Sequence, residues 1–408
     1  MPLSPFAIRS RLAVAFFFQA AVVGLWTVNF PVFLRAFELG WLIAYTGAIA
    51  GVSSLVAPMF GALADDKVPA ERLFGGLCIM ASGLLVLMFY LIEHQVAWGW
   101  VVLVMSFFWL LYTPTWSLLT SICFANLPNK ESDFPIIRAI GTVGWMVAGL
   151  ATSYVLHSDQ SPLSGYVSAG VLLSLGCYAF CLPSTPPLGK GPRSLRRILG
   201  LEALSLLANR DQRVFFLTTL MMALPLAAFY PYTPRLLESL GKTDVAGAMT
   251  LGQVLEIVAM LTLVSLMKRL RIKTLISLGL IAALLRYAFY LVGVHEVSSV
   301  WVMIGLSLHG IAYTFHMITG QIFLERRVEP GQRGQAQSLL ASVNGIGGVI
   351  GSLLVGQWFL HTIERTGTPR WIEFWSLLAI LILGILIYFM RSYRGLPATN
   401  ELDAKIDH

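Results

Sequence analysis

Long apolar stretches separated by short polar breaks run along almost the whole chain. A helix needs about 20 apolar residues to cross the hydrocarbon core of a bilayer, and roughly twelve stretches approach that length. They lie near residues 11–34, 41–64, 74–92, 97–124, 134–156, 163–182, 213–236, 245–267, 273–294, 298–324, 335–361 and 371–390. The pattern predicts an all-α membrane protein with 12 transmembrane helices.

The longest polar interruption divides these segments into six and six. It is rich in proline and basic residues and extends from 183 to 212. We therefore expect an N-terminal six-helix half at 1–182, a basic cytoplasmic linker at 183–212, a C-terminal six-helix half at 213–395 and a cytoplasmic tail at 396–408.

Composition and charge agree with this pattern. The chain is 57% hydrophobic and 12% charged, which excludes an ordinary soluble domain. Cytoplasmic loops retain Lys and Arg, and with the N-terminus inside, 21 of the 28 basic residues fall in cytoplasmic segments. We expect a multi-pass membrane protein with both termini cytoplasmic. The net charge of +7 then reflects orientation, and no nucleic-acid partner is expected.

The sequence shows no set of residues that is typical of an enzyme active site or of a metal site. The four cysteines lie inside or at the edges of apolar segments, without metal-ligand spacing, and no nucleophile triad or phosphate-binding glycine loop stands out. We expect no disulfide, metal site, cofactor or enzymatic activity.

Glu256 is the only charged side chain among the 23 residues from Val245 to Met267. A carboxylate in the middle of a membrane helix is expensive, so it indicates a substrate or proton site. Gln253 lies three residues earlier on the same helical face. The alternative for this pair is a hydrogen bond between helices with no role in transport.

A second polar stripe lies in the fifth segment, where Arg138, Thr142 and Trp145 stand at i, i+4 and i+7. Arg138 is only about one turn inside the segment, so extension of its side chain to the cytoplasmic surface is an equal alternative. Ser132 and Asp133 are the expected caps at the start of this helix, and Pro135 suits its first turn.

Aromatic side chains crowd the fourth, seventh and tenth segments. Such residues form stacking faces for sugars or nucleobases, but they also fill helix cores. They are Trp109, Tyr112, Trp116, Phe229, Tyr230, Tyr232, Tyr313 and Phe315.

The loop after the second segment reads Gly61-Ala62-Leu63-Ala64-Asp65-Asp66-Lys67, followed by Arg72. It resembles the cytoplasmic loop motif of the major facilitator superfamily, whose carriers have two six-helix halves and a substrate site between them. Gly61 would permit close helix approach, while Asp65 and Arg72 would pair or cap a helix end in gating. An ordinary polar loop remains the alternative.

Other polar and small residues inside the segments have structural interpretations. In the superfamily the ninth helix packs on the outside, so we expect Arg286 to form a structural ion pair or an interfacial anchor. For His309 and His316 we favour a buried hydrogen bond over a proton relay. Gly347 and Gly351 make a small-xxx-small pair suited to helix packing.

Scattered blocks over most of the chain resemble the nucleoside:proton symporters of that superfamily. They are Tyr112-Thr113-Pro114-Thr115, Ser132-Asp133-Phe134-Pro135-Ile136-Ile137-Arg138, Gly141-Thr142-Val143-Gly144, Leu285-Arg286-Tyr287-Ala288 and Arg333-Gly334-Gln335-Ala336-Gln337. The resemblance implies that Arg138, Thr142 and Trp145 line the substrate site from one half, and Gln253 and Glu256 from the other. Glu256 and Arg138 would then face one cavity.

The chain also departs from that family. Where the characterised nucleoside carriers have Gln and Asn in the seventh helix, this chain has Ala227 and Tyr230. An acidic position in the tenth helix corresponds here to Thr314, beside the expected aromatic Tyr313. These replacements remove expected hydrogen bonds and one candidate proton carrier, which leaves Glu256 for proton coupling.

Together with the family resemblance, these features predict a monomeric carrier of the bacterial inner membrane that imports nucleosides by proton symport and alternating access. Its partners would be a small-molecule substrate, protons and the lipid bilayer. A sugar or glycoside carrier of the same fold is the first alternative. A membrane receptor or scaffold without transport is the second, although Glu256 argues against it.

Overall fold

The computed structural model describes residues 4–27, 30–158, 160–188, 201–242, 245–364 and 369–395, and all regular structure in these ranges is helical. Eleven helices are long and apolar enough to cross a membrane, and a shorter apolar helix, Leu251–Leu266, corresponds to the remaining predicted segment. The prediction of an all-α protein with 12 transmembrane segments is confirmed.

The helices follow the predicted segments closely. The first group comprises α1 (Pro5–Trp26), α2 (Phe30–Ala36), α3 (Ile43–Ser53), α4 (Ala57–Asp66), α5 (Ala70–Glu93), α6 (Trp98–Asn126), α7 (Lys130–Leu150) and α8 (Leu163–Tyr178). The second comprises α10 (Arg210–Leu226), α11 (Phe229–Ser239), α12 (Val245–Leu266), α13 (Ile272–His295), α14 (Ser299–Tyr313), α15 (Thr319–Glu325), α16 (Arg333–Phe359) and α17 (Trp371–Ser392).

In the described structure three predicted segments change helical geometry part-way, so that each comprises two α-helices joined by a short 3₁₀, π-helical or turn step. The seventh, for example, divides into α10 and α11 after Pro225, because proline cannot donate a main-chain hydrogen bond. Helix α10 also begins at Arg210, inside the predicted linker, and residues 201–208 form a short 3₁₀ helix. Residues 189–200 and 396–408 lie outside the described part of the chain, so the boundaries of the halves, linker and tail stay predictions.

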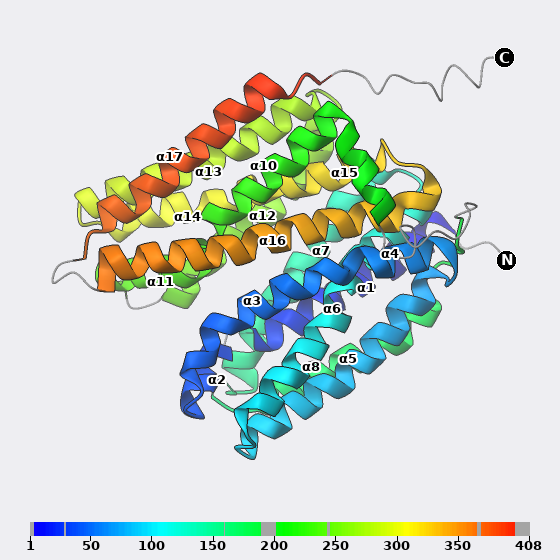
Figure 1. Ribbon diagram of the computed structural model, residues 1–408, viewed down its shortest axis with the longest axis horizontal. Coiled ribbons are helices and arrows are strands. Elements are labelled where there is room, and N and C mark those ends of the chain that lie inside the picture. Colours follow the sequence, from blue (N-terminus) through cyan, green and yellow to red (C-terminus); the bar gives the residue numbers. More distant parts are fainter. Residues whose placement is uncertain are drawn as a thin grey trace.

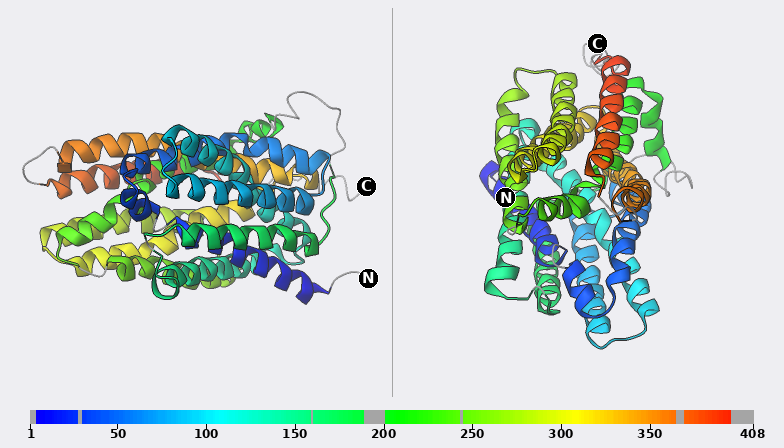
Figure 2. Two further views of the ribbon diagram at one scale, coloured as in Figure 1. Left: turned by 90° about the horizontal axis from the view of Figure 1, so that it is seen from below. Right: turned by 90° about the vertical axis from the view of Figure 1, so that its left-hand side faces the viewer.

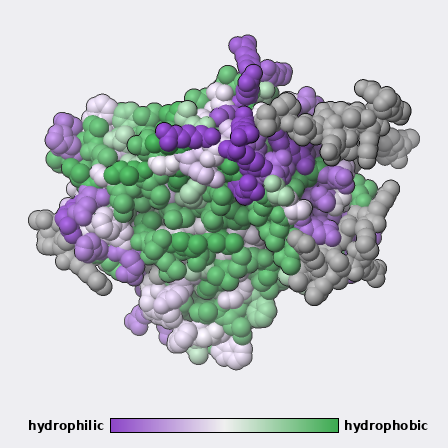
Figure 3. Space-filling view, turned by 45° about the horizontal axis from the view of Figure 1, so that its top comes forward, coloured by the Kyte–Doolittle hydropathy of each residue, from purple (hydrophilic) through white to green (hydrophobic). Residues whose placement is uncertain are grey.

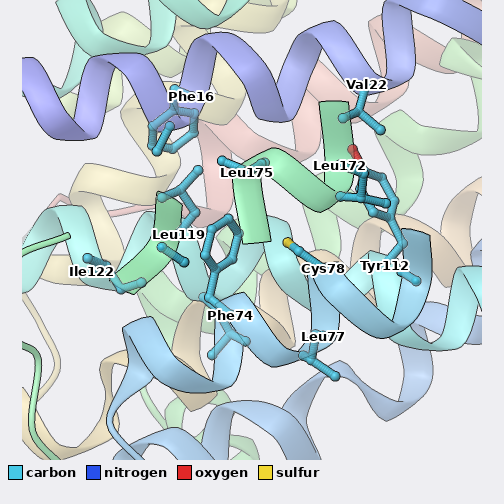
Figure 4. Close-up of a cluster of buried hydrophobic side chains, with 14 of the residues drawn as sticks. Phe16, Val22, Phe74, Leu77, Cys78, Tyr112, Leu119, Ile122, Leu172 and Leu175 are labelled. Atoms are coloured by element: carbon cyan, nitrogen blue, oxygen red, sulfur yellow. The ribbon is translucent and has the colours of Figure 1, made fainter. Parts of the chain in front are cut away.

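Two groups of helices stand side by side, with α1 to α8 in one and α10 to α17 in the other (Figures 1 and 2). The first group has a core in which α1, α5, α6 and α8 meet, with Phe16, Phe74, Tyr112 and Leu172 fully or almost fully buried (Figure 4). Helix α16 runs along the boundary and packs on α3 and α4 of the first group and on α10 of its own.

The outer surface is strongly apolar. Large side chains such as Leu353, Leu354 and Ile380 are 63%, 59% and 66% exposed, and Figure 3 shows a broad hydrophobic face across the middle of the molecule. Exposure on this scale would be unfavourable in water and is stable against lipid chains.

The glycines of α16 allow it to approach α10 closely. A Cβ atom added at Gly347 would come within 2.5 Å of the Leu220 carbonyl oxygen, and one at Gly351 within 2.7 Å of the Leu224 Cα. The packing role predicted for this pair is confirmed, because main-chain atoms leave no room for a side chain.

We predict that Gly347→Ala lowers the thermal stability of the detergent-solubilised protein, since an added methyl group must push two helix backbones apart at a cost of about 1–3 kcal/mol. Gly348→Ala is the matched control, because a Cβ there meets nothing within 4 Å. Equal melting temperatures for the two variants would contradict this account of the α10–α16 contact.

Candidate functional site

A cavity of ≈ 180 Å³ lies between the two groups of helices. Helices α1, α6 and α7 line it from the first group, and α11, α12 and α14 from the second. Its lining residues are Ala20, Trp116, Arg138, Gly141, Thr142, Trp145, Tyr230, Gln253, Glu256, His309 and Tyr313. The structure therefore brings together seven of the eight side chains predicted to bind substrate.

Two hydrogen bonds cross this cavity from α7. The Thr142 hydroxyl donates to Oε1 of Glu256 on α12 at 2.8 Å, and the Arg138 guanidinium donates to the Tyr313 hydroxyl on α14 at 2.8 Å. Both bonds join one half of the molecule to the other. Any separation of the halves at this level must break them or exchange them for bonds to a solute.

The position of α7 follows from its sequence. Residues at i, i+4 and i+7 lie on one face of a helix, which brings Arg138, Thr142 and Trp145 to the cavity. The opposite side of α7 carries glycine at Gly144, where an added Cβ would overlap the main chain of Phe17 on α1. This close packing on α1 fixes the direction in which the polar stripe points.

The start of α7 differs from the prediction. The N-cap is Asn129, whose side chain accepts from the Ser132 main-chain N–H at 3.4 Å. Asp133 lies in the first turn and forms an ion pair with Arg9 at 2.9 Å, so neither Ser132 nor Asp133 caps the helix. Asn is as effective a cap, and it stands one residue before the helix begins.

The Arg138 side chain reaches inward. Its guanidinium lies over the rings of Phe16 and Trp116, 5.3 and 5.5 Å from their centroids, and contributes to the cavity wall. Cation–π contacts of this kind offset part of the cost of removing the charge from water. The alternative of extension to the cytoplasmic surface is therefore not adopted.

Glu256 and Gln253 are 6% and 7% exposed and lie on the cavity wall. Arg138 shares the cavity with Glu256, as expected, but no ion pair joins these two side chains in the described structure. Each has a neutral partner instead: Thr142 for the carboxylate and Tyr313 for the guanidinium. Arg138 and Glu256 thus line one cavity, each with its own neutral partner.

Thr314 does not line the cavity. It is completely buried, and its hydroxyl donates to the main-chain carbonyl of Glu256 at 3.5 Å. Successive residues on a helix project about 100° apart, so when Tyr313 faces the cavity, Thr314 faces the backbone of α12. The assignment of Thr314 to the lining was wrong.

The structure corrects the expectation for Arg286 and confirms the buried hydrogen bond expected for His309. Arg286 is 1% exposed and donates to Nδ1 of His309 at 2.9 Å; it is neither an outer anchor nor a member of a described ion pair. His309 reaches the cavity wall as well as satisfying a buried hydrogen bond. The sequence did carry a signal for this position of His309. It stands four residues before Tyr313, and this spacing places both side chains on one face of α14.

The predicted aromatic residues separate into two groups. Trp116, Tyr230 and Tyr313 line the cavity, whereas Tyr232 stacks on Phe359 with centroids 4.2 Å apart. The remaining members pack against other helices, and Tyr112, for example, donates to the Gln19 carbonyl at 2.9 Å.

The predicted gating motif lies at the end of the molecule where α1 begins and α17 ends (Figure 1). Asp65 on α4 accepts hydrogen bonds from the main-chain N–H groups of Gly334 and Gln335, both at 3.1 Å. These donors belong to the first turn of α16, so Asp65 caps that helix and complements its dipole. Gly61 allows the contact, since an added Cβ would meet the Gly334 carbonyl. The Arg72 side chain is exposed and forms no hydrogen bond or ion pair with another described residue.

Ion pairs reinforce closure at this end. The nearly buried Glu325 accepts from Lys130 on α7 at 2.6 Å and from Arg333 at 2.7 Å, and Arg326 pairs with Glu131 of α7. The Lys130–Glu325 and Arg326–Glu131 pairs each join the two halves. At this end, which the charge pattern predicts to be cytoplasmic, the halves are held together.

We predict that Glu325→Gln weakens closure, because Lys130 and Arg333 then face each other without a carboxylate between them. Distances between spin labels at exposed Lys67 and Glu329 should shift toward longer values. The labels are placed in a background without the exposed cysteines Cys177 and Cys181.

Glu373→Gln serves as the control for this substitution. Its exposed ion pair with Arg370 lies within one half, at the start of α17, and such pairs contribute little. An unchanged distance distribution in Glu325→Gln, or an equal shift in both variants, would contradict a closing role for Glu325.

Comparison with known proteins finds relatives along almost the whole chain. The sequence model of the family described as nucleoside H⁺ symporter matches residues 6–396. The chain is 33% identical to the putative nucleoside transporter YegT of Escherichia coli over 98% of this chain and 96% of that protein. It is 28% identical to the xanthosine permease of Escherichia coli over 96% of this chain and 97% of the permease.

Solved structures show the same fold. The crystal structure of nucleoside transporter NupG superposes with a TM-score of 0.69 at 22% identity, over 95% of this chain and 99% of that one. FucP, a major facilitator superfamily transporter in the outward conformation, gives a TM-score of 0.71 at 17% identity, over 94% and 98% of the two chains. The chain belongs to the nucleoside H⁺ symporter family and has the fold of the major facilitator superfamily.

Proposed function

We propose that this carrier imports nucleosides across the bacterial inner membrane by proton symport. The observation that carries the proposal is the cavity between the halves, where Thr142 bonds to Glu256 and Arg138 to Tyr313. Both bonds connect the parts that alternating access must move against each other. The names of the family and of its relatives YegT and NupG support nucleosides as the solutes.

The lining suits a small solute with a ring and several hydroxyl groups. The cavity of ≈ 180 Å³ is smaller than the roughly 300–1,000 Å³ typical of sites for drug-sized ligands. Trp116, Trp145 and Tyr230 supply aromatic faces for a base. Gln253 can both donate and accept, so it suits ribose hydroxyl or base N–H groups.

Glu256 is the proposed proton carrier. An ionised carboxylate inside the membrane is unfavourable unless a charge or hydrogen bond compensates it. Arg138 and Thr142 provide that compensation while the halves are together. When they separate, uptake of a proton neutralises Glu256, and the carrier can change conformation without an isolated buried charge.

The closed end indicates the state of the cycle. Asp65, Lys130 and Glu325 hold the halves together at the predicted cytoplasmic end. On α3, Gly51 lies against α16. One turn earlier on the same helix, a Cβ added at Gly47 would meet nothing within 4 Å. We propose that this arrangement is the outward-facing state, which loads solute from the periplasm.

We predict that proteoliposomes containing the protein take up labelled uridine and that other nucleosides compete, whereas free sugars do not. Competition by sugars and not by nucleosides would favour a sugar carrier. Absence of any solute flux would support a receptor or scaffold.

We predict that Glu256→Gln abolishes uridine accumulation driven by a pH gradient, because the amide cannot take up the proton. Exchange of internal for external uridine should persist, since it needs no net proton movement. Glu373→Gln, with its exposed carboxylate, should accumulate uridine normally. Full accumulation by Glu256→Gln would refute its role in coupling.

A further inference from the structure

His309 stands between two cavities. One is the proposed solute site. The other is a space of ≈ 30 Å³ among the second group of helices, large enough for about two water molecules. Its wall includes Arg286, His309 and His316. His309 is 3% exposed, and both of its ring nitrogens lie within hydrogen-bond distance of protein atoms.

The contact with Arg286 fixes the state of this ring. The guanidinium nitrogen of Arg286 lies 2.9 Å from Nδ1 of His309. Arginine has donors only, so Nδ1 must be the acceptor and carries no proton. A neutral imidazole then has its single N–H at Nε2. A doubly protonated ring would place two donors face to face in a buried environment.

Packing holds the ring in this orientation. The Phe229 ring stacks on His309 with centroids 3.9 Å apart and planes 7° apart. The Arg286 guanidinium lies 5.0 Å from the centroid of Phe229 and 4.6 Å from that of Tyr287. Its Nε has no hydrogen-bond partner in the described structure. A buried cation is costly when no carboxylate compensates its charge. The Arg286 guanidinium instead donates to a histidine at the site.

The Nε2–H group points to the solute site with only a weak partner. The Tyr230 hydroxyl lies 3.4 Å from Nε2, near the upper limit for a hydrogen bond. Tyr230 is 53% exposed and belongs to the cavity wall. A solute oxygen at normal distance would therefore be a better acceptor than this hydroxyl.

We propose that His309 is a specificity-determining residue, a fixed Nε2–H donor that recognises a carbonyl oxygen on the base, and that Arg286 is the positioning residue that fixes its tautomer. This inference rests on the proposed nucleoside site. The favoured solutes are nucleosides with a ring carbonyl where others carry an amino group. Uridine is preferred over cytidine, and inosine over adenosine.

The neighbouring Glu256 explains the value of a fixed donor. Helices α12 and α14 touch at Gly310, where an added Cβ would overlap the main chain of Glu256. The carboxyl and imidazole groups thus reach the cavity from adjacent points. Glu256 gains an O–H donor only when it takes up a proton, whereas His309 donates in both states. Carbonyl recognition is therefore maintained through the proposed proton cycle.

The first test measures the affinity of the purified full chain for uridine, cytidine, inosine and adenosine. The wild type should favour each carbonyl nucleoside about 10- to 100-fold, the effect of leaving one buried polar group without its partner. His309→Phe should remove the preference by weakening uridine and inosine. His309→Gln, which retains an N–H donor, should keep most of it.

Outcomes of this test separate the two proposals. Nucleosides that bind without discrimination in the wild type, or a preference that survives His309→Phe, would overturn the role of His309 alone. If no nucleoside binds to the wild type, the proposed function fails and this inference fails with it.

The second test observes the tautomer directly by ¹⁵N NMR of protein labelled at histidine. The resonances absent from His309→Gln identify His309, and we expect a proton on Nε2 only. Arg286→Lys should retain this signature because lysine also donates, whereas Arg286→Met should admit the Nδ1–H form. A proton on Nδ1 in the wild type would overturn the proposal whatever the transport data show.

Discussion

A polar group inside a bilayer has to find its hydrogen-bond partner within the protein, and in this molecule the partners come from opposite halves. The bond from Thr142 to Glu256 is the clearest case. Because the carboxylate is buried, it depends on this bond for compensation while it is ionised, and the bond ties α12 to α7. The same bond that stabilises the buried charge therefore restrains the motion that transport requires.

The closed end depends on a different balance. There the halves are joined by main-chain donors that bond to Asp65 and by ion pairs, of which the one at Glu325 is buried. The exposed pair between Arg326 and Glu131 can be exchanged for water at small cost. The halves are thus restrained both at the cavity and at this end, so a change in the charge or occupancy of the cavity acts against the contacts of the closed end.

Much of this could be predicted from the sequence because the membrane limits the choices. Apolar length identifies the spanning helices, and the isolation of Glu256 in an apolar segment drew attention to a residue that lines the cavity between the halves. The stripe of Arg138, Thr142 and Trp145 indicated one face of α7. The interrupted helices were less visible, since a short break in an apolar stretch barely changes its hydropathy.

What could not be predicted was which partner each polar residue finds. Thr314 was assigned to the cavity by resemblance, but the helical rotation of one residue turns it to the backbone of α12. Arg286 was expected to face outward or pair with an acid. Its actual partner, His309, lies 23 residues away on the neighbouring helix, and only the packing of α13 on α14 brings them together.

The partner of Arg286 also bears on the departures from the family pattern. Tyr230 stands where an amide is expected, and a phenol offers one hydroxyl where an amide offers a carbonyl and two N–H donors. His309 adds the Nε2–H donor beside that hydroxyl. Because Arg286 donates to Nδ1, the proton stays on Nε2, and Nε2 cannot act as an acceptor. A histidine thus provides polar recognition at this wall, and Arg286, on the side of the ring away from Tyr230, fixes its tautomer. The loss of the amide changes the means of recognition and leaves the wall able to donate a hydrogen bond.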